Sequence, residues 1–427
     1  MSYARVRWTS VVASSIRQQT WRTVTPYYFK AIGHVVPRLL RRPLNRRTDI
    51  GRDIRVVGLL STATGIGQSG RLCVSALRQA GFNVATHNLS RLFSVDDGVP
   101  FEATGSSDAK AGGISIYHLN PPMMLLGMVA AGLRRYRRDT NVAYWAWEVP
   151  RLPSGWLKAL DRVDAVLVPS TFCQTTVANS TDKPVLVVPH PLAIVDGRGT
   201  DGVLPDRSRF RVLTVFNCGS SLYRKNPWAT IRAFKRAFGT DPDAELILKI
   251  ADGRQHVADL ARLAADVGDA PNIRIVDEMM DADALDALMR SADVYISLHR
   301  SEGFGLTVAE AIMREVPVIV TDWSGTTDFC PPSLAYCVGY DLVPVDDPHP
   351  VYAELQGAQW AEPSVEAAAR HLVAVRENKT AAHARARQLR TMLVERLAEQ
   401  TYAGAIEAII EQAAGRARPV ASTQSAR

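Results

Sequence analysis

The sequence predicts an α/β protein with two successive parallel-sheet domains. Strand and helix signals alternate over residues 51–195, and the same alternation begins again at residue 209. Residues 196–208 between them are rich in Gly, Asp and Arg and lack an apolar period, which is typical of a linker. Alternating strands and helices form parallel sheets covered on both faces, so we expect two Rossmann-like domains that face a cleft.

In the first domain, residues 54–60 are an apolar run rich in β-branched side chains, which predicts a buried strand. A helix is predicted over residues 71–79, because Gly81 follows its last apolar residue. Further strand signals lie at residues 83–87, 114–117, 142–147, 163–168 and 185–188.

In the second domain, strand signals lie at residues 210–216, 245–250, 273–276, 293–297 and 316–320. Helices are predicted at residues 227–238 and 282–290, and residues 364–414 are alanine-rich and helical. We therefore expect a basic extension over residues 1–50, a first domain over 51–195, a linker over 196–208, a second domain over 209–385, a helix over 386–413 and a disordered tail over 414–427.

The composition is that of an ordinary globular protein kept in a reducing compartment. Hydrophobic residues make up 47% of the 427 residues and charged residues 22%. The longest apolar run, residues 123–133, is too short to span a bilayer, and no secretory signal is present. We expect a cytoplasmic protein with reduced thiols, because no Cys-x-x-Cys pair links its five cysteines, which are Cys73, Cys173, Cys218, Cys330 and Cys337.

The positive charge is concentrated at the start of the chain. Ten Lys and Arg residues and no acid precede Asp49, which leaves the rest of the chain near −3 when the net charge is +7. Because aromatic residues are interleaved with the cations, we expect residues 1–48 to contact an anionic membrane at the inner face of the plasma membrane. A solvated tail and a mitochondrial transit peptide are the alternatives. No nucleic-acid-binding module follows the basic segment, so nucleic acid is not an expected partner.

Residue 54 is where the strand and helix pattern begins, so we expect the two domains to fold without the basic extension.

Two glutamates around a glycine loop provide the strongest functional signal. Glu302 precedes Gly303-Phe304-Gly305, and Glu310 lies in the helix that this loop opens. A helix N-terminus binds anions through its free N–H groups, while carboxylates accept hydrogen bonds from hydroxyls. A nucleotide sugar offers both phosphates and hydroxyls. The alternative is that both acids are ordinary surface glutamates, one of them favoured by the helix dipole.

Arg224-Lys225-Asn226-Pro227 predicts a phosphate-binding turn at the start of another helix. Asn226 is a suitable N-cap and Pro227 suits the first helical position. Two cations at a helix N-terminus oppose the helix dipole, and a bound diphosphate would offset this. An exposed basic turn is the alternative.

A second glycine-rich segment supports a competing function. Gly65, Gly67 and Gly70 match the dinucleotide fingerprint, which favours a Rossmann oxidoreductase that binds NAD(P). However, four residues separate the preceding strand from Gly65, and the next strand ends at His87-Asn88 without the acid that would bind a ribose.

Several of these stretches together resemble family 4 of the retaining glycosyltransferases (glycosyl transferases group 1), over residues 54–412. The family's mark is a serine followed by two glutamates with seven residues between them, as in Ser301, Glu302 and Glu310. The other matching stretches are Tyr144-Trp145-Ala146-Trp147-Glu148, Val168-Pro169-Ser170-Thr171-Phe172 and Arg224-Lys225-Asn226-Pro227. Leu342-Val343-Pro344-Val345 and Trp360-Ala361-Glu362-Pro363 resemble a bacterial polysaccharide branch.

The resemblance implies a GT-B fold, in which the last helix returns to the first domain, and sugar transfer with retained configuration. It implies an acceptor-side first domain and a donor-binding second domain. The catalytic residues it implies are Glu302, Lys225, Arg224 and His118. The donor-binding residues it implies are Glu310, Gly303, Phe304, Gly305, Leu306, Ser301 and Gly219. The segment with Gly65, Gly67 and Gly70 would contact phosphate or acceptor.

The family pattern is incomplete at one position. Many members carry an arginine directly after the glycine that follows the first strand of the second domain. In this chain that glycine is Gly219, and Ser220 and Ser221 follow it. Arg224 is the candidate replacement.

Other candidates near the predicted cleft carry weaker signals. His118 and Asn120 follow a strand, and Glu148 ends an aromatic stretch; Asn120 and Glu148 are candidates for the acceptor side. His118 has the alternative of a structural histidine. Trp145 and Trp147 are expected to pack in the core, and His190 to be structural.

We expect neither a metal nor a cofactor. Asp281 and Asp283 mimic a metal-binding pair, but they begin a helix, so capping explains them better.

The sequence therefore predicts transfer of a hexose of the mannose or glucose type from a nucleotide-diphosphate sugar. The expected acceptor is a glycan or lipid-linked saccharide in bacterial surface polysaccharide synthesis. A non-catalytic GT-B scaffold is a further alternative.

Overall fold

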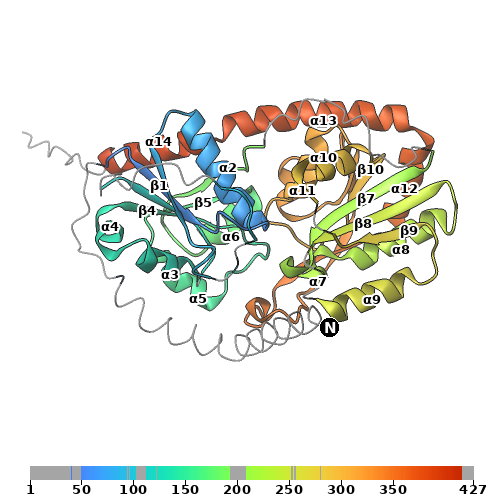
Figure 1. The fold of residues 1–427 in the computed structure, drawn as a ribbon, viewed down its shortest axis with the longest axis horizontal. Helices are drawn as coiled ribbons and strands as arrows, with labels where there is room; N and C mark the ends of the chain where they lie inside the picture. Colours follow the sequence, from blue (N-terminus) through green and yellow to red (C-terminus); the bar gives the residue numbers. More distant parts are fainter. Residues whose placement is uncertain are drawn as a thin grey trace, which may run out of the picture.

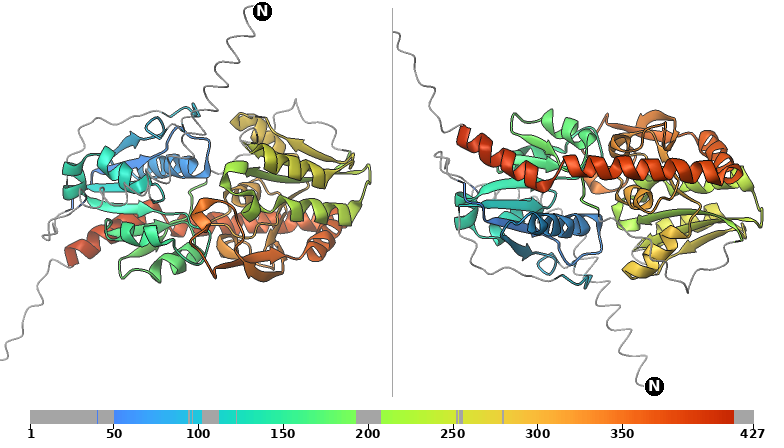
Figure 2. Two further views of the ribbon diagram at one scale, coloured as in Figure 1. Left: turned by 90° about the horizontal axis from the view of Figure 1, so that it is seen from below. Right: turned by 90° about the horizontal axis from the view of Figure 1, so that it is seen from above.

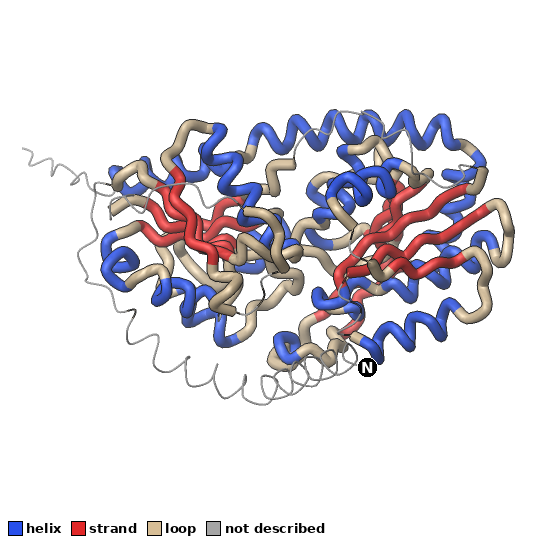
Figure 3. The backbone as a smooth tube through the Cα atoms, viewed as in Figure 1, coloured by secondary structure: helices blue, strands red, loops and turns tan. Residues whose placement is uncertain are grey.

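The computed structural model describes residue 40 and residues 50–415, except residues 94, 96, 102–111, 122, 193–207, 252, 254–255 and 279. Nearly all of the basic extension and of the predicted linker lies outside these residues, as do residues 416–427 of the predicted tail. The described chain forms two α/β domains side by side (Figure 1), each with a central sheet (Figure 3).

The first domain is a six-stranded parallel sheet in the order β2-β1-β3-β4-β5-β6. Its strands are β1 Ile54–Gly58, β2 Val84–Asn88, β3 Ile114–His118, β4 Thr140–Tyr144, β5 Ala165–Val168 and β6 Val185–Val187. Its helices are α2 Gly65–Gln79, α3 Met123–Ala130, α4 Leu133–Arg138, α5 Ser154–Leu160 and α6 Thr171–Ala178. Helix α2 packs on one face, and helices α3 to α6 cover the other.

The second domain has a six-stranded parallel sheet in the order β12-β11-β10-β7-β8-β9. Its strands are β7 Phe210–Asn217, β8 Ala244–Ala251, β9 Ile273–Val276, β10 Val294–Ser297, β11 Val318–Thr321 and β12 Tyr336–Val338. The helices are α7 Leu222–Lys225, α8 Pro227–Phe238, α9 Val257–Val267, α10 Ala282–Arg290, α11 Leu306–Met313 and α12 Val365–Glu377, with short 3-10 turns η1 Cys218–Ser220 and η3 Ser324–Asp328. The predicted doubly covered parallel sheets are therefore confirmed.

Most of the elements that sequence patterns missed are short or almost uniformly apolar, with the exception of the amphipathic helix α9. Helix α3 reads Met-Met-Leu-Leu-Gly-Met-Val-Ala, so no polar face reveals a helical period. A two-stranded antiparallel sheet formed by β13 Tyr340–Pro344 and β14 Gln359–Pro363 also went unpredicted, although both sequences had been recognised as motifs. The connection between its strands carries the 3-10 turn η4 Pro350–Tyr352.

The predicted helix over residues 386–413 is divided in two. Helix α13 Lys379–Glu399 buries Leu389 and Leu393 against the second domain, while α14 Tyr402–Gly415 buries Ile406 in the first. Thr401 separates them, and its side-chain oxygen accepts a hydrogen bond from Gly404 N at 3.1 Å, as in a helix N-cap. The two helices run across both domains (Figure 2). The return to the first domain is confirmed, and the helical structure continues to Gly415, two residues into the predicted tail.

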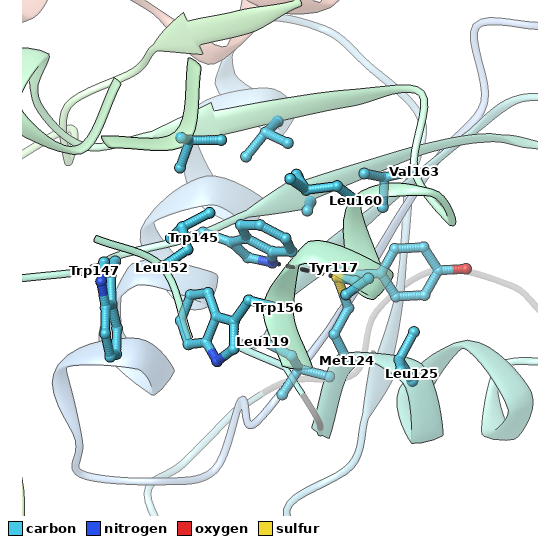
Figure 4. Packing of buried hydrophobic residues seen from close by; sticks show 14 of the residues in the cluster. Tyr117, Leu119, Met124, Leu125, Trp145, Trp147, Leu152, Trp156, Leu160 and Val163 are labelled. Atoms are coloured by element: carbon cyan, nitrogen blue, oxygen red, sulfur yellow. Dashed lines mark hydrogen bonds between the residues drawn. The ribbon is translucent and has the colours of Figure 1, made fainter. Parts of the chain in front are cut away.

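An aromatic cluster forms the core between the first sheet and helices α3 and α5 (Figure 4). Trp145 and Trp147 are buried there, as predicted, and both contact Trp156 at ring distances of 5.2 and 4.6 Å. The connection between β13 and β14 adds Tyr352 and Leu355 to this cluster. A segment of the second half of the chain therefore completes the core of the first domain.

Leu40, from the predicted extension, is completely buried in the same cluster. Its carbonyl oxygen accepts hydrogen bonds from Tyr136 Oη at 3.0 Å and from Arg162 Nη1 at 3.4 Å. The expectation that the two domains fold without this extension stays a prediction, but the burial of Leu40 indicates that its loss would leave a cavity in the core and lower stability.

Replacing Leu40 by Ala should lower the free energy of unfolding by about 2–5 kcal/mol, the range observed for buried Leu to Ala changes. Denaturant unfolding measures this. Leu92→Ala is the matched control, because Leu92 is 60% exposed and its change should stay within about 0.5 kcal/mol. An equal, small effect of both substitutions would contradict the burial of Leu40.

Candidate active site

The glycine loop that follows β10 brings Glu302 to the edge of the second sheet. Gly305 adopts φ 93° at the start of α11, a left-handed conformation that favours glycine. A Cβ atom on Gly305 would lie 2.5 Å from Thr326 Cγ2, so a side chain has no room there. Phe304 is buried against Phe329 at a ring distance of 5.0 Å. The loop conformation is thus fixed by close packing.

Glu302 is buried and forms two ion pairs. Its Oε1 atom lies 2.5 Å from Lys225 Nζ, and its Oε2 atom lies 3.1 Å from Arg224 Nη1. Its backbone N–H donates to Ser324 Oγ at 2.8 Å. The structure therefore brings together the acid and the two cations that the sequence placed in separate motifs.

The turn that carries these cations is built as the sequence predicts. Asn226 adopts the left-handed conformation, and its side chain accepts a hydrogen bond from Ala229 N, which confirms it as the N-cap of α8. Arg224 is buried, and its guanidinium also donates to the carbonyl oxygens of Ser301 and Ser220, each at 2.9 Å. Gly219, in η1, is exposed next to this turn, and its N–H donates to Asn217 Oδ1.

Residues of the first domain close the site from the other side. Glu148 Oε1 lies 3.4 Å from Arg224 Nη2, and the Glu148 carbonyl oxygen accepts a hydrogen bond from Ser301 Oγ. Ser170 Oγ donates to the Gly303 carbonyl oxygen at 2.6 Å. Glu148 thus faces the cation cluster, where the sequence had suggested only the acceptor side.

The glycine segment near residue 65 begins a helix, which corrects the predicted loop. Thr64 caps α2, so Gly65, Gly67 and Gly70 all lie within the helix. A Cβ atom on Gly67 would lie 2.2 Å from Thr62 Oγ1, and one on Gly70 would lie 2.8 Å from Leu60 Cδ2. Helix α2 packs closely on the residues that follow β1, and this packing favours glycine at positions 67 and 70 whether or not a ligand binds there.

Glu310 and α2 meet across the domains. Gln68 Nε2 donates to Glu310 Oε1 at 2.9 Å. Gln68 lies inside the glycine-rich segment. Sequence reasoning missed its side chain, because the dinucleotide fingerprint specifies only the glycines. Leu306, the first residue of α11, is half-buried one turn before Glu310.

His118 and Asn120 take structural positions within the first domain. His118 is buried, stacks on Tyr144 at 4.5 Å and lies 3.3 Å from Ser69 Oγ. Asn120 Nδ2 donates to the Ala146 carbonyl oxygen at 3.0 Å. No contact joins either residue to Glu302 or Lys225 within the described residues, so their roles at the donor or acceptor stay predictions.

Sequence reasoning missed two supports of the loop. Arg300 precedes the site, and its Nε atom lies 2.5 Å from Glu362 Oε2, while its guanidinium lies 5.4 Å from the ring centre of Trp360. The motif around Trp360 thus holds the start of the loop. His299 is the second support, with Nδ1 3.0 Å from Ser297 Oγ.

Residues 173–406 match the model of a family described as family 4 glycosyltransferases in conflict systems. The chain belongs to family 4 of the glycosyltransferases. No curated protein sequence is significantly similar to it.

Solved structures show the same two-domain architecture as this glycosyltransferase. HepE of Anabaena in complex with UDP-glucose aligns with a TM-score of 0.57 at 12% identity, over 86% of this chain and 99% of HepE. The apo structure of OtsA aligns with a TM-score of 0.54 at 13% identity, over 85% of this chain and 99% of OtsA. These likenesses establish the GT-B fold that the sequence predicted. No helix among the described residues is long and apolar enough to cross a bilayer.

The buried cations dominate the electrostatics of the glycosyltransferase site. Burial by itself raises the pKa of Glu302, but Lys225 and Arg224 outweigh it and lower this pKa to about 2. Burial lowers the pKa of Lys225, partly offset by Glu302. Burial raises the pKa of Glu310, opposed by the hydrogen bond from Gln68. Glu302 is therefore ionised at neutral pH and acts as an acceptor of hydrogen bonds.

Three buried histidines should make the glycosyltransferase sensitive to mild acid. Burial lowers the pKa of His118 to about 3 and the pKa values of His190 and His299 to about 4, from 6.5. Unfolding below pH 6.5 therefore takes up protons, so stability is lost as the pH falls from 6.5 towards 4. Near pH 5 the free energy of unfolding should fall by about 1.4 kcal/mol per pH unit for each histidine, which is about 4 kcal/mol per pH unit for the three.

Chemical denaturation between pH 7 and pH 4.5 measures this slope. His118→Phe retains a ring beside Tyr144 and should lower the slope by about a third. A free energy of unfolding that stays constant from pH 7 to pH 5 would contradict the buried neutral histidines.

Proposed function

We propose that this glycosyltransferase moves a hexosyl group, of the glucose or mannose type, from a UDP-sugar to a saccharide or lipid-linked saccharide, with retained anomeric configuration. The observation that carries the proposal is the pairing of Glu302 with Lys225 and Arg224 at the end of β10. The choice of UDP rests on HepE, which has been solved with UDP-glucose.

Lys225 and Arg224 supply positive charge where a diphosphate would lie. In the proposed reaction the bond from the sugar C1 to the diphosphate oxygen breaks, and a bond from C1 to the acceptor oxygen forms on the same face. The leaving diphosphate takes the acceptor's proton. The growing negative charge of the diphosphate is stabilised by the two cations and by the N–H groups at the start of α11.

Glu302 is better suited to orient the sugar than to attack it. A carboxylate nucleophile needs a free oxygen facing C1, as in retaining glycosidases. Both oxygens of Glu302 are engaged by Lys225 and Arg224. We infer that the diphosphate draws Lys225 away, which frees Oε1 to accept a hydrogen bond from a hydroxyl of the donor sugar.

Glu310 is proposed to bind the ribose of the donor. Its carboxylate is already engaged by Gln68, so donor binding would exchange the amide N–H for ribose hydroxyls. Backbone groups of Gly303 to Gly305 complete the proposed sugar and phosphate site, together with Ser301 and Leu306. No metal or cofactor takes part in this proposal.

The alternatives are weaker on structural grounds. Two of the three glycines that suggested an oxidoreductase, Gly67 and Gly70, are accounted for by the packing of α2, and β2 ends at Asn88 without an acid. A scaffold without activity has no use for the buried cluster around Glu302, because removing charges from water is costly. The matched family is described as acting in conflict systems, so a role in biological conflict is a second candidate, in addition to surface polysaccharide synthesis.

Glu302→Gln should reduce turnover at saturating donor by about 10- to 150-fold, because a hydrogen bond to a charged acceptor contributes about 1.5–3 kcal/mol. UDP affinity, measured by calorimetry, should change little. Glu366→Gln is the control, because it alters an exposed carboxylate that pairs with Arg236 outside the proposed donor contacts and outside the supports of the loop. Near-normal turnover of Glu302→Gln would refute the assigned role.

Lys225→Ala should weaken the binding of UDP and slow transfer, because the charge that Lys225 meets grows as the bond to the diphosphate breaks. Calorimetry with UDP and a rate measurement with UDP-glucose are the tests. Arg262→Ala is the control for loss of positive charge, because Arg262 is an exposed basic residue that contacts the Trp228 ring. Unchanged affinity together with an unchanged rate would leave Lys225 without a role in the donor site.

We also propose a cytoplasmic enzyme whose basic residues before Asp49 attach it to an anionic membrane surface. A deletion of residues 1–36 retains Leu40 and removes five of the ten cations. It should reduce co-sedimentation with vesicles of phosphatidylglycerol and phosphatidylcholine, and salt should weaken binding of the full chain. Equal sedimentation of both forms would reject attachment through residues 1–36.

A further inference from the structure

A groove between the two domains lies beside the proposed catalytic loop and has no role in the site described above. It consists of two hollows, of about 420 and 320 Å³, whose walls share Pro150 and Trp323. We call it the Trp323 groove. Each volume lies within the range of about 300–1,000 Å³ found for small-molecule sites.

The position of the Trp323 groove links it to Glu302. Ser324 lines the larger hollow, and its Oγ atom accepts the hydrogen bond from Glu302 N at 2.8 Å. On the opposite wall, Pro150 follows Glu148 by two residues. The groove therefore starts next to the residues that would surround the donor sugar.

The charge of the groove argues against a diphosphate as its occupant. Among the residues that the structure describes, none in the wall of the larger hollow is basic, and Arg151 is the single basic residue in the wall of the smaller one. Lys225 and Arg224, the cations suited to phosphate, line neither hollow. The groove therefore differs in charge from the proposed donor site around Lys225 and Arg224.

The lining combines aromatic faces with polar groups, of which Asp322 is an acid. Trp323 is half-buried and lies 5.3 Å from Tyr340 and 5.8 Å from Phe172 in ring distance. Exposed Thr175 of α6 and the carboxylate of Asp322 add oxygen atoms that accept hydrogen bonds. A sugar ring has an apolar face and a rim of hydroxyls, so it matches both parts of this lining.

We propose that the Trp323 groove binds the neutral saccharide portion of the acceptor, with a ring stacked on Trp323 and hydroxyls directed to Asp322 and α6. Binding between the domains would place the end of the acceptor beside Glu302. The proposal rests on the proposed transfer function and names the subsite that selects the acceptor.

The test is direct binding of three neutral tetrasaccharides, maltotetraose, mannotetraose and chitotetraose, to the full chain by calorimetry. At least one should bind. Trp323→Ala removes the stacking face, and Thr175→Arg fills the larger hollow from an exposed position. Each should weaken binding about tenfold or more, equivalent to about 1.4 kcal/mol. Ala178→Arg, exposed on the same helix but outside both hollows, should bind as the unmodified protein does.

UDP affinity and the hydrolysis of UDP-glucose, measured on the same proteins, separate this proposal from the transfer function. Both should be unchanged in Thr175→Arg. If none of the tetrasaccharides binds, or if binding survives in Thr175→Arg, the saccharide groove is overturned whatever the donor measurements show. If UDP does not bind while a tetrasaccharide binds in the groove, the donor assignment fails and the groove stands as a saccharide site.

Discussion

The buried guanidinium of Arg224 is the interaction on which the site depends. It contacts the carboxylates of Glu302 and Glu148 and donates to two carbonyl oxygens, so it joins the donor loop, the cation turn and the first domain. Burial lowers the pKa of Arg224, but the two carboxylates outweigh it and raise this pKa. Removing either acid would leave the buried positive charge only partly compensated, which is more costly than losing an exposed ion pair.

This dependence explains why the two domains are joined so closely around the loop. Ser170 and Cys173 both donate to the Gly303 carbonyl oxygen, and His190 packs edge-on against Phe304 at 4.9 Å. Farther away, Tyr352 enters the first core and α14 packs on the opposite face. If the donor binds as proposed, it would replace contacts that already exist, namely the pairs of Glu302 with Lys225 and of Glu310 with Gln68.

The two sides of Glu302 differ in chemical character, which supports the roles proposed for them. On one side, Lys225 and Arg224 concentrate positive charge suited to a leaving diphosphate. On the other, Ser324 and Trp323 begin a groove whose lining is aromatic and almost uncharged. An enzyme that joins a charged donor to a neutral acceptor needs such an asymmetry, because each partner is recognised by groups of a different kind.

The sequence by itself determined the local features of this protein. Residues 227–238 and 282–290 were predicted as helices with the bounds that the structure has, because the apolar period lies within each segment and an N-cap residue directly precedes it. The turn at Asn226 was predicted for the same reason, since its N-cap hydrogen bond joins residues three positions apart. The glycine loop after Glu302 was recognised as a loop, but its conformation depends on packing against Thr326 and Phe329.

Only the tertiary structure decided which distant residues meet. Lys225 and Glu302 are 77 positions apart, and Gln68 and Glu310 are 242 apart, so no local pattern joins them. The burial of Leu40 and of Tyr352 in one core likewise depends on packing against elements far along the chain. The physical reason is that a periodic pattern shows which face of an element is buried, whereas long-range packing and charge pairing select the partner.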